Sequence, residues 1–279
     1  MPKYKMIKYP RTPHLEGSRL QKGDEDLKQV PFSEIRGKMI AVEEKCDGAN
    51  SAISFDQNGD LLLQSRGHYL IGGVREKHFN LFKQWATVHQ SAFFEVLGTR
   101  YVLYGEWVFA KHSVFYNALN HYFLEFDILD RETGLFLDTP SRHSLLAGLP
   151  IISVPVLHRR SFDKKEDLIR LIGPSNYIRE GHLERLADLA LQDGLDPNAV
   201  LAETDPTNIM EGLYLKIEEN GSVAGRLKYV RPSFLQQVLE SGTHWLSRPI
   251  IPNQLAYPVE EIFAPSLPDS AKTITGDFS

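Results

Sequence analysis

The sequence predicts an α+β fold of twisted, mainly antiparallel sheets with flanking helices, a helical insertion and a proline-rich C-terminal tail. Short apolar runs of strand length occur in the first and the last part of the main body of the sequence. Asn58-Gly59 and Asn220-Gly221 are two of the predicted turns between these runs. Such dipeptides tolerate the positive φ that tight hairpin loops require. Between these β-rich parts the apolar residues recur at helical spacing, which predicts an all-α insertion at about 163–205.

The same patterns place the individual elements. Strands are expected at 39–43, 51–55, 61–64, 101–108, 121–129, 151–157, 212–218 and 222–230. Helices are expected at 78–97, 141–147 and 232–239, and within the helical segment 163–202. Past these elements the prolines at 249, 252, 258, 265 and 268 disfavour helix and sheet, so we expect an extended arm that packs on the body or stays mobile.

Composition is that of a globular protein. The chain has 279 residues, of which 42% are hydrophobic and 24% charged, and its 31 Lys and Arg against 36 Asp and Glu give a net charge of −5. These values exclude intrinsic disorder, a collagen-like repeat and a disulfide scaffold. We expect a main domain over 1–240, including the insertion, and a C-terminal extension over 241–279.

Two further observations bear on localisation. The single cysteine, Cys46, cannot form an internal disulfide. The first residues lack the apolar run of a signal peptide, and no stretch approaches the ~18 apolar residues of a membrane span. We therefore expect a soluble, cytoplasmic protein with no membrane partner.

The segment Lys45-Cys46-Asp47-Gly48-Ala49-Asn50, between two predicted strands, carries the chemical signal. A Lys-x-Asp-Gly match alone is weak and is compatible with a polar turn. The segments that follow it in order change this interpretation: Ser65-Arg66-Gly67, Tyr104-Gly105-Glu106-Trp107, Glu125-Phe126-Asp127-Ile128, Glu211-Gly212-Leu213-Tyr214-Leu215-Lys216 and Arg226-Leu227-Lys228.

Taken together, these segments resemble the ligand set of the covalent nucleotidyltransferases, the superfamily of DNA ligases, RNA ligases and mRNA capping enzymes. Within it the chain most resembles ATP-dependent RNA ligases. Asn50 matches an asparagine that follows their lysine motif, 111–116 is similar to a segment of that group, and only 48 residues follow Arg231, too few for an appended OB barrel. The fold this implies is an adenylyltransferase domain of the ATP-grasp-like ligase type.

The resemblance implies a role for each site residue. Lys45 would be the nucleophile that forms lysyl-AMP, and Lys216 and Lys228 would assist catalysis by lowering its pKa and neutralising the α-phosphate. Glu106 would meet the ribose, Phe126 would stack on adenine and Arg66 would engage phosphate. Glu211 would hold Mg²⁺, with Mn²⁺ as an alternative. The full set expected to bind ATP is Lys45, Asp47, Gly48, Asn50, Arg66, Glu106, Phe126, Lys216, Arg226 and Lys228.

Several of these residues have a second, purely structural interpretation. Lys216 and Lys228 could be outward-facing charges on neighbouring strands, and Phe126 could belong to the core. Arg226 departs from the Lys-x-Lys that such ligases often show at this point; arginine keeps the charge but cannot lose a proton, so Lys228 is the preferred α-phosphate ligand. The loop 11–19 has the Gly, Ser and Arg of a phosphate-contacting loop, a common pattern that decides nothing alone.

The sequence therefore predicts an ATP-dependent RNA ligase that joins 3′-hydroxyl and 5′-phosphate RNA ends in RNA repair, with an end-healing kinase or phosphatase as a candidate partner. A DNA ligase and a capping-type guanylyltransferase are the alternatives among enzymes. A non-catalytic nucleotide-binding subunit is the alternative of another class.

Overall fold

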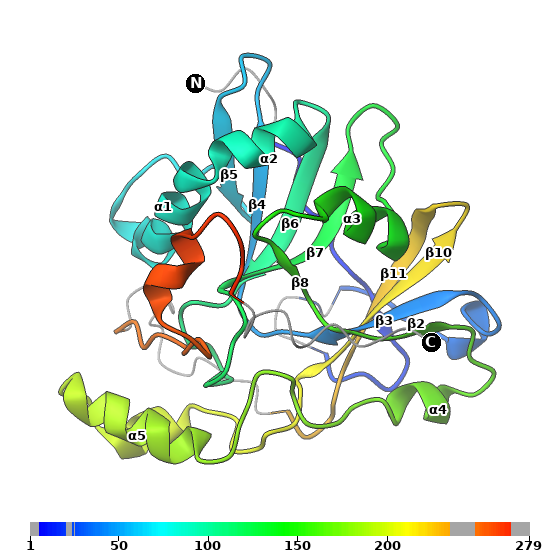
Figure 1. Cartoon of the computed structure of the whole chain (residues 1–279). Helices are drawn as coiled ribbons and strands as arrows, with labels where there is room; N and C mark the ends of the chain where they lie inside the picture. The colour runs from blue at the N-terminus through cyan, green and yellow to red at the C-terminus, as the bar shows by residue number, and fades with distance from the viewer. Residues whose placement is uncertain (1–5, 21–23, 25, 235–248, 269–279) are drawn as a thin grey trace.

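Two facing β-sheets form the body of the protein (Figure 1). The computed structural model describes residues 6–20, 24, 26–234 and 249–268. The first sheet has the order β2-β1-β11-β10-β3-β9. Its strands are β1 (His14–Leu15), β2 (Gln29–Val30), β3 (Ile40–Lys45), β9 (Val156–Arg160), β10 (Gly212–Glu219) and β11 (Ser222–Val230). Only β1 pairs in parallel, with β2 and β11.

The second sheet has the order β5-β4-β6-β7-β8. Its strands are β4 (Ala49–Phe55), β5 (Leu61–Ser65), β6 (Tyr101–Trp107), β7 (Phe123–Asp130) and β8 (Ile152–Ser153). All its pairs are antiparallel except β7 with β8. The expected α+β fold of mainly antiparallel sheets with flanking helices is confirmed for the described residues.

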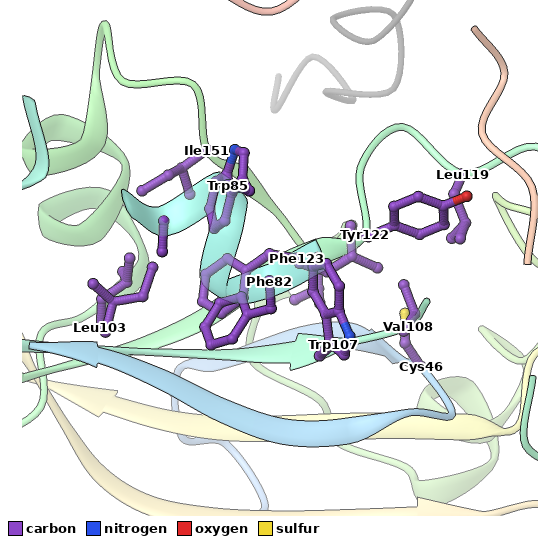
Figure 2. Close-up of a cluster of buried hydrophobic side chains, with 14 of the residues drawn as sticks. Cys46, Phe82, Trp85, Leu103, Trp107, Val108, Leu119, Tyr122, Phe123 and Ile151 are labelled. Carbon is purple, nitrogen blue, oxygen red and sulfur yellow. The ribbon is translucent and has the colours of Figure 1, made fainter. Parts of the chain in front are cut away.

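Helices cover the outer face of the second sheet (Figure 1). They are α1 (Asn80–Val88), α2 (Gln90–Leu97) and α3 (Thr139–Leu146), with the 3₁₀ helices η1 (Phe32–Glu34), η2 (Val74–Phe79) and η4 (Val259–Phe263) elsewhere. Figure 2 shows the main core, in which the α1 side chains Phe82 and Trp85 meet Phe123 and Trp107 of the sheet. The ring centroids of Phe82 and Phe123 lie 5.4 Å apart in a stacked arrangement.

The predicted helix at 78–97 is two helices instead of one. The chain bends at His89 (φ −96°, ψ 6°), whose ring Nε2 lies 3.0 Å from the carbonyl of Ile262. Periodicity detected the apolar face of both helices, but this contact comes from the C-terminal tail and leaves no trace in local sequence.

The predicted strand at 151–157 also divides, and the division joins the two sheets. β8 pairs with β7 in the second sheet, whereas β9 pairs with β3 in the first. Pro155 lies between them and has no N–H to continue a ladder, while its carbonyl accepts from Glu44 N at 3.0 Å. The apolar run at 151–157 therefore contributes one strand to each sheet.

The insertion is less helical than predicted. It contains α4 (Lys165–Ile169), α5 (His182–Gln192) and α6 (Pro197–Ala202), while 170–181 is irregular and is tied to strand β3. Glu44 accepts hydrogen bonds from Ser175 Oγ at 2.5 Å and from the side chain of Asn176 at 2.7 Å. This buried carboxylate fixes the insertion beside the end of β3.

Described segments near both ends of the chain pack on the two-sheet body. The pairing of β1 and β2 beside β11 was not predicted from sequence, because two-residue strands carry no periodicity. In the tail, Ile251 and Ile262 are buried and η4 forms at 259–263. The predicted helix at 232–239 extends beyond residue 234 and lies mostly outside the described residues, and the division into 1–240 and 241–279 stays a prediction. Within the described ranges, every helix is too short or too polar to cross a bilayer.

Candidate active site

A cavity of about 1060 Å³ lies between the two sheets. Its wall includes eight of the predicted site residues, namely Lys45, Asp47, Gly48, Asn50, Arg66, Glu106, Phe126 and Lys228. The insertion contributes Ala199 and Val200, and the tail contributes Ile250 and Ile251. Because segments far apart in sequence close it, the cavity is a product of the fold as a whole, and its volume is in the range of small-molecule sites.

Strand alternation and register bring the cationic residues to this wall. Lys45 lies opposite Gly212 across β3 and β10, and Tyr214 lies opposite Lys228 across β10 and β11. The alternating residues Leu213, Leu215 and Leu227 point to the other face, where they form a second apolar core. One face of the first sheet is therefore apolar and the other carries the site.

Two glycines of the predicted motifs are required by close packing. A Cβ at Gly48 would lie 2.8 Å from the carbonyl oxygen of Trp107, and one at Gly212 would lie 1.9 Å from the carbonyl oxygen of Tyr229. Any side chain at these two points would push neighbouring strands apart. The glycines thus hold the strands that carry Lys45 and Glu211 at their native spacing.

Lys45 and Glu211 form an ion pair at the cavity wall. Lys45 Nζ donates to Glu211 Oε1 at 2.6 Å, and the side chains are 18% and 0% exposed. Burial lowers the pKa of Lys45, but the carboxylates of Glu211, Asp47 and Glu106 outweigh it, so the pKa is raised. The expected lowering of this pKa by Lys216 and Lys228 is therefore not what this arrangement produces, and Lys45 is an ammonium here.

Asp47 holds the neighbouring loop. Its Oδ2 accepts from the backbone N–H groups of Ser113 and Val114 at 2.7 and 3.0 Å, and its own N–H donates to Tyr116 Oη at 2.8 Å. The loop 111–116 is thereby fixed against the residue two places after Lys45. The structure gives Asp47 a positioning role at the wall of the cavity.

Asn50 and Glu106 face each other across β4 and β6. Burial raises the pKa of Glu106 to about 8, with the negative charges of Asp47 and Glu211 adding to the effect and Lys45 opposing it. Asn50 Oδ1 is buried and has no hydrogen-bond partner among the residues that the structure describes. The pair therefore offers one neutral carboxyl and one amide oxygen to hydroxyl or amino groups of a ligand.

Phe126 and Arg66 lie at different parts of the cavity. Phe126 packs edge-on against Tyr9, with ring centroids 5.0 Å apart, and is tilted against Tyr214. Arg66 lines the cavity and is exposed, so its guanidinium can reach a bound ligand. Thr12 Oγ1 lies 2.6 Å from Tyr214 Oη, and both residues line the cavity beside Phe126.

Lys228 is held by a residue that the sequence did not predict. Its Nζ donates to Asp24 Oδ2, and the two side chains are 12% and 11% exposed. We call Asp24, Lys45, Glu211 and Lys228 the open charge cluster. In this cluster Lys45 pairs with Glu211 and Lys228 pairs with Asp24.

Lys216 and Arg226 belong to a different group of charges, behind the cavity wall. Lys216 is fully buried, contacts both oxygens of Glu43 and donates to the carbonyl of Phe126, whereas Arg226 Nε donates to Asp127 at 2.8 Å. We call this set the interior charge cluster; its members are Glu43, Glu125, Asp127, Arg142, Lys216 and Arg226. Of the six, only Glu43 reaches the cavity.

The interior charge cluster joins the two sheets. Glu43 accepts from Arg142 at 2.5 Å and Glu125 accepts from the same guanidinium at 2.8 Å, so that β3 and β7 share one cation from α3. Its three carboxylates match its three cations. A catalytic role for Lys216 stays a prediction, and its contacts here are those of a structural ion pair.

Sequence reasoning missed the N-terminal and distal contributors to the cavity. Tyr9 and Thr12 line the cavity, and Asp24 contacts Lys228 at its wall. All three precede the first motif, and only Thr12 falls in the polar loop 11–19, whose pattern is common in proteins. Among the described residues, no group of three or more His, Cys, Asp and Glu side chains is arranged to hold a metal ion.

Comparison with known proteins identifies the family. The model of the RNA ligase family matches residues 38–230. No curated protein matches the chain. Among solved structures, a variant of Naegleria gruberi RNA ligase with ATP and Mn is 18% identical with a TM-score of 0.45, over 71% of this chain and 51% of that one. An archaeal ATP-dependent RNA ligase is 17% identical with a TM-score of 0.46, over 82% of this chain and 49% of the other. The chain therefore spans about half the length of these structures.

Proposed function

The chain belongs to the RNA ligase family, and from this premise we propose that it is an ATP-dependent ligase that joins 3′-hydroxyl and 5′-phosphate RNA ends. In this proposal Lys45 carries AMP as a covalent phosphoramidate between two half-reactions. The solved structures of similar ligases hold ATP or AMP and Mn, which supports a nucleotide and a divalent cation as ligands here.

The observation that carries the proposal is the position of Lys45. Its amine lies on the wall of a cavity of nucleotide size, against Glu211 and on the same sheet face as Lys228. A lysine nucleophile needs a group that takes up its proton and cations that stabilise the phosphate charge. Glu211 and Lys228 are such groups: Glu211 directly precedes β10, the strand next to Lys45, and Lys228 lies on β11, the strand beyond it.

The chemistry follows in three steps. Lys45 Nζ attacks the α-phosphorus of ATP, so that an N–P bond forms, a P–O bond breaks and pyrophosphate leaves. Before this attack the amine gives up a proton, for which Glu211 Oε1 at 2.6 Å is the nearest acceptor shown. The AMP then passes to the 5′-phosphate of one strand, which restores the lysine. Finally the 3′-hydroxyl of the other strand attacks that phosphate and AMP leaves.

The remaining cavity residues orient the nucleotide. Glu106, protonated at neutral pH, and Asn50 would hydrogen-bond to ribose or strand-end hydroxyls, and Phe126 with Tyr214 would pack against the base. Arg66 would meet the outgoing phosphates at the entrance. When bound, Mg²⁺ or Mn²⁺ would supply positive charge to the phosphates, and the Glu211 carboxylate beside Lys45 would hold it.

Labelling with ATP tests the proposal. Wild-type protein incubated with α-labelled ATP and Mg²⁺ should acquire an acid-labile covalent label, whereas Lys45→Arg, which keeps the charge opposite Glu211, should not. The matched control is Lys38→Arg, which precedes β3. Labelling by GTP in preference to ATP would favour a capping-type enzyme, and absence of label in the wild type would favour a non-catalytic subunit.

Sealing assays test the substrate. Nicked duplexes with a ribonucleotide at the 3′-hydroxyl end should be joined faster than all-DNA nicks, because a 2′-hydroxyl adjoins the attacking group only in the former. The support is Asn50, which lines the cavity opposite Glu106 and, among the described residues, has a buried amide oxygen without a hydrogen-bond partner. Equal rates on both substrates would indicate a DNA ligase and would leave the lysine chemistry unaffected.

A further inference from the structure

The N-terminal segment lies against the strand that carries Lys228. Strand β1 pairs in parallel with β11, with His14 opposite Lys228. The backbone N–H of Lys228 donates to the carbonyl of Pro13 at 3.0 Å, and that of Arg19 donates to Val230 at 3.0 Å. This pairing places the polar loop 11–19, which the proposed reaction does not use, at the wall of the cavity.

Asp24 is the side chain from this region that reaches the site. Its Oδ2 accepts from Lys228 Nζ and lies 3.3 Å from His14 Nε2, while its Oδ1 accepts from Arg11 at 3.3 Å. The carboxylate is 11% exposed. Three donors from two strands and a loop therefore determine where it lies.

His14 orients the carboxylate. Its ring is fully buried, and burial together with the charge of Lys228 lowers its pKa, so the ring is neutral. A carboxylate only accepts hydrogen bonds, so Nε2 carries the proton and Nδ1 accepts from Ser18 Oγ at 2.7 Å. Ser18 Oγ in turn accepts from Val230 N at 2.9 Å, on the same strand as Lys228. A chain of hydrogen bonds thus runs from β11 through Ser18 and His14 to Asp24.

Charge balance explains why such a carboxylate is needed. Lys45 and Lys228 lie on one sheet face and repel each other as they approach the same phosphate, and burial opposes the charge on both. Glu211 compensates Lys45 and Asp24 compensates Lys228. An ammonium has three donors, so a lysine that donates to a carboxylate can also donate to phosphate oxygens.

We propose that Asp24 is the positioning residue of Lys228, and that the bond from Asp24, set by His14, holds the ammonium where it meets the α-phosphate in self-adenylylation. This inference rests on the proposed function. It extends the site beyond the family motifs to the N-terminal segment, which supplies no reacting atom.

Single-turnover labelling separates this role from a structural one. With saturating α-labelled ATP, the amplitude reports the fraction of folded protein and the rate constant reports the site. Asp24→Asn should slow the rate constant ~10–100-fold, as for other partners that orient a functional group, with an unchanged amplitude. Asp24→Glu, which keeps the charge, should recover part of that loss. The matched control is Asp26→Asn, which removes a partner of the same Arg11 at 67% exposure and should change the rate less than about threefold.

A double-mutant cycle completes the test. In a Lys228→Met background, Asp24→Asn should cause no further loss of rate, because its only route to the reaction is gone. Three results would overturn the inference. They are an equal loss of rate from Asp24→Asn in both backgrounds, an equal loss in Asp24→Asn and Asp24→Glu, and a reduced amplitude at an unchanged rate constant. Failure of the wild type to label would instead overturn the proposed function, and this inference with it.

Discussion

The open and the interior charge clusters are built on the same two strands, β10 and β11, yet they differ in what surrounds each lysine. Lys228 pairs with Asp24 and is partly exposed at the cavity, whereas Lys216 pairs with Glu43 and Asp127 and has no exposed surface. Ion pairs at a cavity can exchange a partner for a ligand. Fully buried pairs cannot do so without leaving a charge uncompensated.

Strand alternation determines which face of a sheet a side chain points to, but not whether its position along the strand is at the cavity or in the interior. Tyr214 and Lys216 point to the same side of β10, and so do Arg226 and Lys228 on β11. What separates them is the facing sheet, where Asp127 and the carbonyl of Phe126 meet Lys216 and Arg226. A lysine therefore lines the cavity at one point of the strand pair, and a second lysine joins the two sheets two residues further along, a distance of roughly 7 Å.

Matched substitutions of the two lysines give the largest expected effects. Lys228→Met should slow self-adenylylation ~10²–10³-fold, as expected when one electrostatic contact to a reacting phosphate is lost. Lys216→Met should lower the free energy of unfolding by about 3–5 kcal/mol, because it leaves Glu43 and Asp127 facing each other with one cation fewer. Chemical denaturation and single-turnover labelling of both variants measure the two quantities.

The opposite results would contradict the different roles assigned to Lys216 and Lys228. If folded Lys216→Met lost the labelling rate with unchanged stability, Lys216 would act directly on the nucleotide, as the sequence motif suggested. A Lys228→Met variant that labelled at the wild-type rate would remove Lys228 from the site.

The free energy of unfolding should also depend on pH through Glu106, a residue of the cavity wall, and this effect is expected to be smaller. Because burial raises the pKa of Glu106 to about 8, from an ordinary value near 4.5, its neutral form is favoured by folding. The stability that this provides is present below about pH 4.5 and is lost as the pH rises toward 8. Glu106→Gln does not titrate, so between pH 5 and 8 it should lose roughly 3 kcal/mol less unfolding free energy than the wild type. Parallel pH curves for the two proteins, without nucleotide, would contradict the raised pKa.

Much of the fold was predictable because strands and hairpins depend on the local sequence. The runs around Asn58-Gly59 and Asn220-Gly221 gave the hairpins β4–β5 and β10–β11, with Asn220 at φ 52°. The division at Pro155 and the bend at His89 were not predictable, since each depends on a partner far along the chain.

The candidate site shows the same limit. Ordered motifs identified Lys45, Glu106 and Lys228, which the structure brings to one cavity. They could not reveal that Glu211 pairs with Lys45 or that Asp24 pairs with Lys228, because side-chain partners are chosen by packing across sheets. Nor could they separate Lys216 from Lys228, which share type, strand pair and face.

Mapping the site of covalent AMP determines whether the reactive amine belongs to the open charge cluster. Protein labelled with ATP and Mg²⁺ would be digested under conditions that preserve phosphoramidates, and its lysine peptides would be analysed by mass spectrometry. We predict AMP on Lys45 and on no other lysine. AMP on Lys216 or Lys228, or a modification that survives in Lys45→Arg, would contradict the account.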